Sequence, residues 1–235
     1  MKSYFLLLTV VLCSKLFAQD APINRQKFIF FPHPMTRPWQ VSIGFNSTTM
    51  PLEITEEAHF RVPALDLHVI RKLNKKLHLD ARINSQILQN LVTLGPRWTT
   101  KLSKRVCMGL GDDMGYWFGR INVAGIRTRG NGFQNQPNLA FGYHFNKRIL
   151  LTARAEALMN FGVQTVAGET PVHSKYNLFS GSAYSIILEQ PFAGSKSMTL
   201  GFRAIYTDYY WQTWTLFENY DRKLFFPQII VGLIL

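Results

Sequence analysis

The fold is decided by residues 77–87, which read LHLDARINSQI. Five of the six odd positions are apolar, and every even position is polar. A strand sends alternate side chains to its two faces, whereas a helix would scatter both sets around its axis. The stretch therefore predicts a strand with one apolar face and one polar face.

The same alternation recurs on both sides of this stretch and predicts ten strands. They cover residues 38–48, 62–73, 77–88, 91–102, 105–119, 137–146, 149–161, 176–190, 197–210 and 225–235. Residues 149–161 also contain good helix formers, and we assign them to a strand because their neighbours are strands. Most of these segments exceed the ~9–11 residues that a tilted strand needs to cross a bilayer.

The connections between the predicted strands differ in length. The short ones are residues 74–76, 103–104, 146–148 and 191–196, and the longer polar ones are residues 49–61, 120–136, 162–175 and 211–223. Only the connection near Gln89 and Asn90 breaks this pattern, being too short. Short turns at one end and long loops at the other are typical of outer-membrane barrels, whose short turns lie in the periplasm. An even number of strands then places both termini at that end.

The N-terminus has the pattern of a secretory signal. A positive start is followed by an apolar run, Tyr4–Leu12, and by a small residue, Ala18. Such a run is too short to span a bilayer as a helix and fits a cleaved signal peptide. We predict a signal over residues 1–18, an N-terminal periplasmic extension over 19–37 and a single barrel domain over 38–235.

The two cysteines bear on how the exported chain is held together. Cys13 lies in the predicted signal and raises a lipoprotein alternative, which the bulky Leu12 before it disfavours. Once Cys13 is removed, Cys107 has no partner for an intrachain disulfide. The mature chain must then be stabilised by its packing and its strand pairing alone.

The composition favours an anionic partner. Lys and Arg outnumber Asp and Glu by 26 to 14, and 47% of the residues are hydrophobic, which excludes a disordered chain. A basic balance suits nucleic acid, a phosphorylated glycolipid or an anionic solute. Because the chain is predicted to be exported, we expect no nucleic-acid partner.

The last segment, Leu224–Leu235, resembles the closing strand of outer-membrane barrels. Ile229, Val231, Leu233 and Leu235 lie on one face, although the chain ends in Leu where that family usually has an aromatic residue. With its alternation and its connections, the chain resembles small Gram-negative outer-membrane β-barrel proteins. The resemblance implies an all-β, antiparallel up-and-down transmembrane β-barrel of about 10 strands (8–12) in the cell outer membrane. Its expected partners are outer-membrane lipid and lipopolysaccharide, with small solutes as a further possibility.

The polar face of the predicted strands carries charges of both signs among small residues. A membrane barrel turns its apolar face outward and this polar face inward, and a soluble barrel does the reverse. Inside a narrow lumen such charges must pair. We predict a polar lumen network made of Asp66, His68, Asp80, Arg82, Arg97, Arg154, Glu156 and Arg203. In a membrane barrel, Leu79, Phe141 and Leu151 should face lipid. Asp80, Arg82 and Arg154 should face the lumen, and these six positions test the orientation.

Two histidines allow a different interpretation of that network. His68 lies two residues from Asp66, and His78 lies two residues from Asp80, so a hairpin would bring them together on one face. An acid–base or metal site is conceivable there, and the alternative is a network of hydrogen bonds and ion pairs that fills the lumen. The sequence contains no nucleophile elbow, zinc-protease motif, paired-cysteine motif or phosphate loop. We expect no catalytic residue, no metal and no cofactor.

Aromatic residues and a group of arginines complete the candidate features. Aromatic residues near strand ends fit interface girdles, and they are Trp39, Trp98, Tyr116, Trp117, Tyr143, Tyr206, Tyr209, Tyr210, Trp211 and Trp214. The dense run over residues 206–220 could instead form a stacking platform for a ligand. In the predicted loop 120–136, Arg120, Arg127 and Arg129 suit the phosphate of a surface glycolipid, and the alternative is a solvated loop.

These features predict a non-enzymatic integral outer-membrane protein. Its role would be structural or adhesive, or that of a porin-like narrow pore for small polar solutes. One alternative is a barrel enzyme that modifies lipid A through His68 and His78. Another is a secreted, soluble, lipocalin-like barrel that binds an apolar ligand in its interior.

Overall fold

A computed structural model describes residues 27–235 of the chain, apart from residues 56–59, 124–125, 146–147, 173–176 and 217–220. The predicted signal over residues 1–18 lies outside this part. Ten strands form the barrel: β1 (Trp39–Thr49), β2 (Arg61–Lys72), β3 (Leu77–Ser85), β4 (Gln89–Lys101), β5 (Val106–Val123), β6 (Ile126–His144), β7 (Leu150–Ala167), β9 (Phe179–Pro191), β10 (Ser197–Thr207) and β11 (Leu224–Ile234). The described part also contains a short strand β8 (Thr170–Val172), a one-turn helix α2 (Leu52–Thr55) and a 3-10 helix η3 (Trp211–Leu216).

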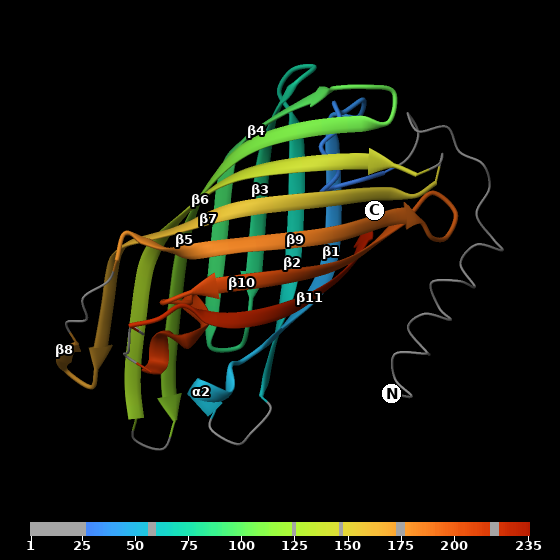
Figure 1. The fold of residues 1–235 in the computed structure, drawn as a ribbon. Coiled ribbons are helices and arrows are strands. Elements are labelled where there is room, and N and C mark those ends of the chain that lie inside the picture. The colour runs from blue at the N-terminus through green and yellow to red at the C-terminus, as the bar shows by residue number, and fades with distance from the viewer. Residues whose placement is uncertain (1–26, 56–59, 124–125, 146–147, 173–176, 217–220) are drawn as a thin grey trace.

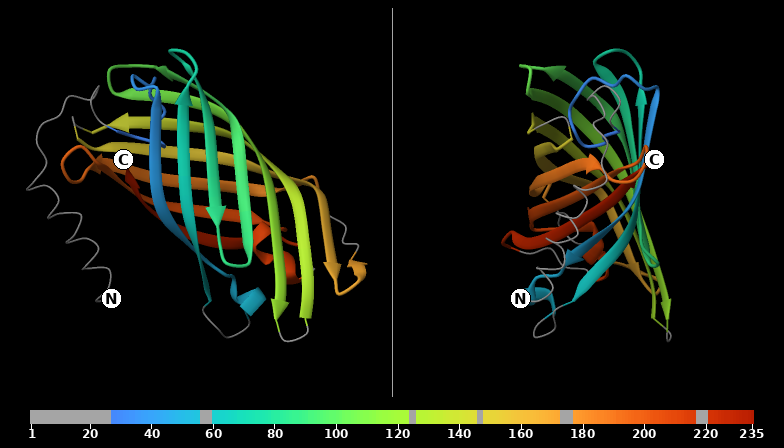
Figure 2. Two further views of the ribbon diagram at one scale, coloured as in Figure 1. Left: turned by 180° about the vertical axis from the view of Figure 1, so that it is seen from behind. Right: turned by 90° about the vertical axis from the view of Figure 1, so that its right-hand side faces the viewer.

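The ten strands close into one antiparallel barrel (Figures 1 and 2). Each strand pairs with its neighbour in the chain, except that β7 pairs with β9 because β8 lies to the side along the upper part of β7. The first and last strands, β1 and β11, pair along residues 42–48 and close the ring. The all-β, ten-stranded antiparallel barrel predicted from the sequence is therefore confirmed, and residues 149–161 belong to a strand.

The apolar faces of the strands point outward. Phe141 is 44% exposed, and Leu79 and Leu151 are half-buried on the same outer surface. Asp80 and Arg154 are 4% and 9% exposed and point into the barrel. This orientation is typical of transmembrane barrels. It is the reverse of what the lipocalin-like alternative requires, so that alternative is wrong.

The two ends of the barrel differ as the sequence predicts. The C-terminus and the β2–β3, β4–β5, β6–β7 and β9–β10 connections lie at one end of the barrel, which is drawn at the top and right of Figure 1 and which we call the lower end. Strands β5, β6 and β7 are long, with 18, 19 and 18 residues. At the opposite end, which we call the upper end and which is drawn at the bottom of Figure 2, β5 and β6 visibly extend beyond their neighbours. About ten residues suffice to cross a bilayer, so each of these three strands is about eight or nine residues longer than such a crossing requires.

The prediction of a loop over residues 120–136 is wrong, because residues 120–123 belong to β5 and residues 126–136 belong to β6. The two strands pair in an unbroken register from Val106–Tyr143 up to Val123–Ile126. The sequence hides these strands because their inner face carries glycines in place of large apolar residues. A side chain at Gly119 or Gly130 would meet the Trp214 ring at 2.7 or 2.5 Å, so the glycines make room for this indole.

Candidate functional site

The middle of the lumen contains two clusters of buried ion pairs. In the first, on β2, β3 and β4, Arg82 donates two hydrogen bonds of 2.6 Å to the carboxylate of Asp66. Asp80 pairs with Arg97, and its Oδ1 lies 2.6 Å from Nε2 of His68. Adjacent antiparallel strands place these side chains opposite one another on the inner face, His68 facing Arg82 and Asp66 facing Asn84.

The second cluster lies on the other wall, on β5, β7 and β10. Arg154 contacts Asp113 at 2.7 Å and Glu156 at 3.0 Å, and Glu156 contacts Arg203 at 2.7 Å. All four side chains are at most 11% exposed. Buried charges are stable only when they are paired, and here each acidic group has a guanidinium partner.

All eight residues of the predicted polar network lie in these two clusters. In the first cluster the pairs form between neighbouring strands, as expected for a hairpin. Asp66 binds Arg82, and the partner of His68 is Asp80 on the next strand. His78 takes no part in either cluster and lies 2.9 Å from the hydroxyl of Thr99.

Sequence reasoning missed two acidic members of the lumen. Asp113 lies on the polar face of the alternating segment 106–118, so the alternation alone would have placed it in the polar lumen network. Glu189 lies near the lower end of β9 and is fully buried. Nothing near Glu189 in the sequence indicates its role, because its partners come from the N-terminal segment.

The N-terminal segment, which we define as residues 27–38, folds back into the lower end of the barrel. Phe28, Ile29, Phe30 and Phe31 are 0–6% exposed, although they precede the first strand. The backbone N–H groups of Ile29, Phe30 and Phe31 donate to the Glu189 carboxylate at 2.7, 3.1 and 2.8 Å. The part of the predicted periplasmic extension that the structure describes therefore fills the lower end of the lumen.

This segment also contacts the first charge cluster. Arg97 donates a hydrogen bond of 2.6 Å to the carbonyl oxygen of Ile29. The Phe30 ring lies 5.0 Å from the His68 ring, and the Arg82 guanidinium lies 5.6 Å from the centre of the Phe30 ring. The N-terminal segment, which we also call the lower plug, therefore packs directly against the first cluster. We call the two clusters together the polar layer.

His33 lies in the same segment, close to the lower rim. Its ring is 5.7 Å from Phe28 and 6.0 Å from His144, and its Nδ1 lies 2.7 Å from the carbonyl oxygen of Pro34. Burial lowers the pKa of His33 to about 4, and the positive charge of Lys101 acts in the same direction. The ring is therefore neutral at neutral pH.

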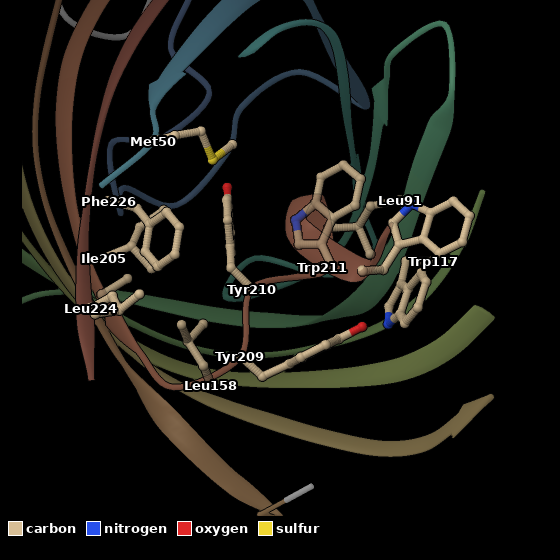
Figure 3. Packing of buried hydrophobic residues seen from close by; sticks show 12 residues of the cluster. Met50, Leu91, Trp117, Leu158, Ile205, Tyr209, Tyr210, Trp211, Leu224 and Phe226 are labelled. Atoms are coloured by element: carbon tan, nitrogen blue, oxygen red, sulfur yellow. The ribbon is translucent and has the colours of Figure 1, made fainter. Parts of the chain in front are cut away.

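The upper end of the lumen is closed by aromatic residues that follow β10. Tyr209, Tyr210, Trp211 and Trp214 are each at most 4% exposed. Figure 3 shows Tyr209, Tyr210 and Trp211 pointing into the barrel among residues from opposite walls, including Trp117 and Phe226. We call these four residues of the β10–β11 connection the upper cap.

For five of the ten aromatic residues, the predicted position in a girdle is wrong. Trp117 lies on the inner face of β5. Tyr209, Tyr210, Trp211 and Trp214 lie inside the barrel because the chain after β10 turns inward and inserts its rings between the walls. The other five do lie on the outer surface. Trp39, Tyr116, Tyr143 and Tyr206 are exposed and Trp98 is half-buried.

Among the described residues, a small cavity lies between the plug, the polar layer and the cap. The cavity in the middle of the lumen has a volume of about 30 Å³ and is lined by residues that include His68, Arg154, Arg203 and Tyr210. A polar cavity of that size holds one or two water molecules. No group of three or more metal-binding side chains occurs in the part of the chain that the structure describes, and none of the helices described there could span a membrane.

No protein-family description and no curated protein matches the sequence. Among solved structures, the chain is similar to the KdgM porin, solved with disordered oligogalacturonate (TM-score 0.39, 10% identity, 82% of this chain and 97% of that chain). It is also similar to an outer-membrane channel from Pseudomonas putida F1 (TM-score 0.41, 8% identity, 87% of this chain and 98% of that chain). A third similar structure is the translocator domain of the autotransporter NalP from Neisseria meningitidis (TM-score 0.41, 9% identity, 83% of this chain and 87% of that chain). At these identities the likeness concerns the fold alone.

Proposed function

We propose that this chain is an integral outer-membrane barrel with a closed lumen and a structural or adhesive role at the cell surface. The observation that carries the proposal is the filling of the lumen in three layers. The N-terminal segment, the ion-pair clusters and the upper cap succeed one another and leave a cavity of about 30 Å³. A barrel that served as a constitutive channel would need a continuous water path.

The position in the outer membrane is supported by the outer surface of the barrel. Its exposed residues include large apolar side chains from every wall, such as Ile43, Leu94, Leu110, Phe202 and Val231. Exposed apolar area of this extent is costly in water and is matched by lipid. The strands that project at the upper end would then stand in the extracellular space, where an adhesive surface is useful.

The experiment combines fractionation with electrophysiology. We expect the protein in the outer-membrane fraction, with a gel mobility that changes on heating, and we expect purified protein to give no discrete current steps in planar bilayers. Recovery in the soluble periplasm would contradict membrane insertion. Regular current steps from the unmodified protein would contradict a closed lumen.

A gated narrow pore is the second candidate, and the Glu189 contact favours it. Three of the hydrogen bonds that hold the plug go to one carboxylate, that of Glu189. Others include one from Arg97 to Ile29 and one from the Phe28 N–H to Oε1 of Gln40 at 3.2 Å. A segment whose central residues depend on one carboxylate could leave as a unit and expose the polar layer. Removal of the segment would then produce current steps, whereas in a permanently closed barrel it would not.

The geometry gives little support to an enzyme that modifies lipid A. The histidines proposed for that role are buried inside the barrel, with exposed fractions of 2% for His68 and 1% for His78. A cavity of about 30 Å³ has no room for a glycolipid. Replacing both histidines with Ala should therefore leave the lipid A profile of the cell unchanged in mass spectrometry.

A further inference from the structure

The outer surface of the projecting strands combines arginines with an aromatic patch. Arg120 on β5 and Arg127 and Arg129 on β6 are exposed. Their chain neighbours Gly119 and Gly130 face Trp214 in the lumen. Successive residues of a strand point to opposite faces, so Arg120 and Arg129 point away from the lumen, and Arg127 shares the face of Arg129.

The repulsion between these arginines is not offset by acidic side chains among the described residues. Arg120 and Arg129 lie directly opposite each other in the β5–β6 register, and Asn122 is opposite Arg127. Like charges directly opposite on neighbouring strands are destabilising. None of the three has an ion-pair partner among the described residues, and Glu169, in the β7–β8 turn, pairs with none of them there. The arrangement therefore calls for an external anion.

An aromatic patch lies immediately below the arginines on the same outer face. We define it as Tyr116, Phe118, Phe133 and Phe161, each 37–43% exposed. Tyr116 lies 5.9 Å from Phe118 and 5.1 Å from Phe133, and Phe133 stacks on Phe161 at 5.6 Å between ring centres. Phe118 is two residues from Arg120 along β5, which corresponds to about 7 Å. The face therefore changes from apolar to cationic over a distance that matches the boundary between acyl chains and headgroups.

A groove joins the aromatic patch to the arginines. Its volume is about 380 Å³, and Tyr116, Phe118, Arg129, Asn131 and Gln164 are among the residues that line it. Within it, the Asn131 amide donates to the Tyr116 hydroxyl at 2.9 Å, which fixes both side chains. An amphiphile could place its acyl chains along the rings and its anionic headgroup against the guanidinium groups.

We propose that this outer face of β5, β6 and β7 binds the phosphorylated headgroup of lipid A in the outer leaflet. The inference rests on the proposed function, because it requires the upper end to face the cell exterior. Guanidinium groups bind phosphate through paired, charge-assisted hydrogen bonds. Two arginines directly opposite each other, with a third beside them, suit a ligand with more than one phosphate, and the aromatic patch suits its acyl chains.

The test measures binding of fluorescent bisphosphorylated lipid A to the full-length protein in detergent. The variant is Arg120→Gln with Arg129→Gln, which removes both charges of the facing pair and keeps the side chains long and polar. The matched control is Lys104→Gln with Arg105→Gln, two exposed cations in the β4–β5 turn at the opposite end of the barrel. We expect the variant to bind at least about tenfold more weakly, since charge-assisted hydrogen bonds are lost, and the control to bind like the wild type.

Competing ligands identify the source of the phosphate. We expect lipid A without phosphates and phosphatidylglycerol to compete poorly, and inorganic phosphate to compete only far above the lipid A concentration. Equal affinity of the variant and the wild type would overturn the inference, as would equal competition by phosphatidylglycerol or by inorganic phosphate. Fractionation of the same variants separates the two proposals. Lipid A binding with no outer-membrane location would contradict the proposed function alone, and correct location with unchanged binding would contradict the inference alone.

Discussion

Glu156 shows at the scale of one residue why the polar layer is stable. Its carboxylate contacts Arg154 at 3.0 Å and Arg203 at 2.7 Å, and all three groups are buried. Replacing Glu156 with Gln keeps the size of the side chain and leaves Arg203 without its acidic partner. Removal of one member of a buried pair costs about 3–5 kcal/mol, and we expect a loss of that size in the free energy of unfolding, measured by urea titration in lipid vesicles.

The matched control for Glu156 is the exposed pair at the upper end. Glu53 and Arg222 are 3.1 Å apart, with side chains 45% and 72% exposed. Exposed pairs contribute only about 0–1 kcal/mol, so Glu53→Gln should change stability little. Equal losses in the two variants would show that the lumen pair is hydrated and weak.

Gly130 and Trp214 are coupled by a close approach inside the barrel. A Cβ added at Gly130 would lie 2.5 Å from Cε3 of the indole, so Gly130→Ala must displace the ring. Overpacking of this kind costs about 1–3 kcal/mol. In a Trp214→Ala background the ring is gone, and the same Gly130→Ala change should cost under about 0.5 kcal/mol. A double-mutant cycle of unfolding free energies measures the difference, and additive effects would argue against the contact.

Residues of the polar layer were predictable because each has a local signal. Asp80 and Arg82 interrupt an apolar series at every second position, and this pattern determines which face they occupy. The identity of their partners was not predictable. Arg82 binds Asp66, sixteen positions away, because of the β2–β3 register, and that register depends on the turn between the strands.

At the scale of elements, the N-terminal segment has a built-in sensitivity to pH. Burial lowers the pKa of His33 to about 4 from its usual 6.5, so the docked segment binds its proton less readily than the released segment does. The contribution of His33 to docking is therefore fully present above pH 6.5 and is lost as the pH falls from 6.5 towards 4. Lys101 and His144, which face His33 from β4 and β6, oppose protonation in the docked state.

The measurement is hydrogen exchange of the Ile29, Phe30 and Phe31 amides in the folded protein. We expect their protection, corrected for the intrinsic rate, to fall between pH 7 and pH 5. His33→Gln cannot titrate and should flatten this fall, while the Glu189 contacts that hold the same amides remain. A parallel fall in both proteins would assign the effect to another group.

Elements differ in how far the sequence could predict them. The ten barrel strands were predictable because apolar and polar residues alternate between the outer and inner faces of each strand. The upper parts of β5 and β6 were not, since residues 120–136 are rich in Gly, Asn and Arg and lack a regular alternation of apolar and polar residues. The plug and the cap were missed for another reason. Their aromatic residues, such as Phe30 and Trp214, are buried by walls that are distant in the sequence.

At the scale of the whole molecule, the outer surface has the opposite polarity to that of a soluble barrel. Part of the interior, in contrast, is apolar like the interior of a soluble barrel. Its outside is apolar, yet both ends of its lumen are apolar clusters, with the charged layer between them. A fully polar lumen would attract water and favour conduction. Apolar ends exclude water and strengthen the ion pairs that they enclose, so closure and stability have the same structural origin.

This layered arrangement predicts that opening one end will not open the barrel. Deleting residues 27–37, with the first 26 residues retained, removes the lower plug but leaves the two charge clusters and the upper cap in place. We therefore expect no current steps from this variant in planar bilayers, provided that its heat-dependent gel mobility shows a folded barrel. Adding Tyr210→Ala, Trp211→Ala and Trp214→Ala should open the second end, hydrate the polar layer and produce steps. Steps from the single deletion would instead show that the N-terminal segment is the gate of a pore, and silence of the combined variant would show that the charge clusters alone block the lumen.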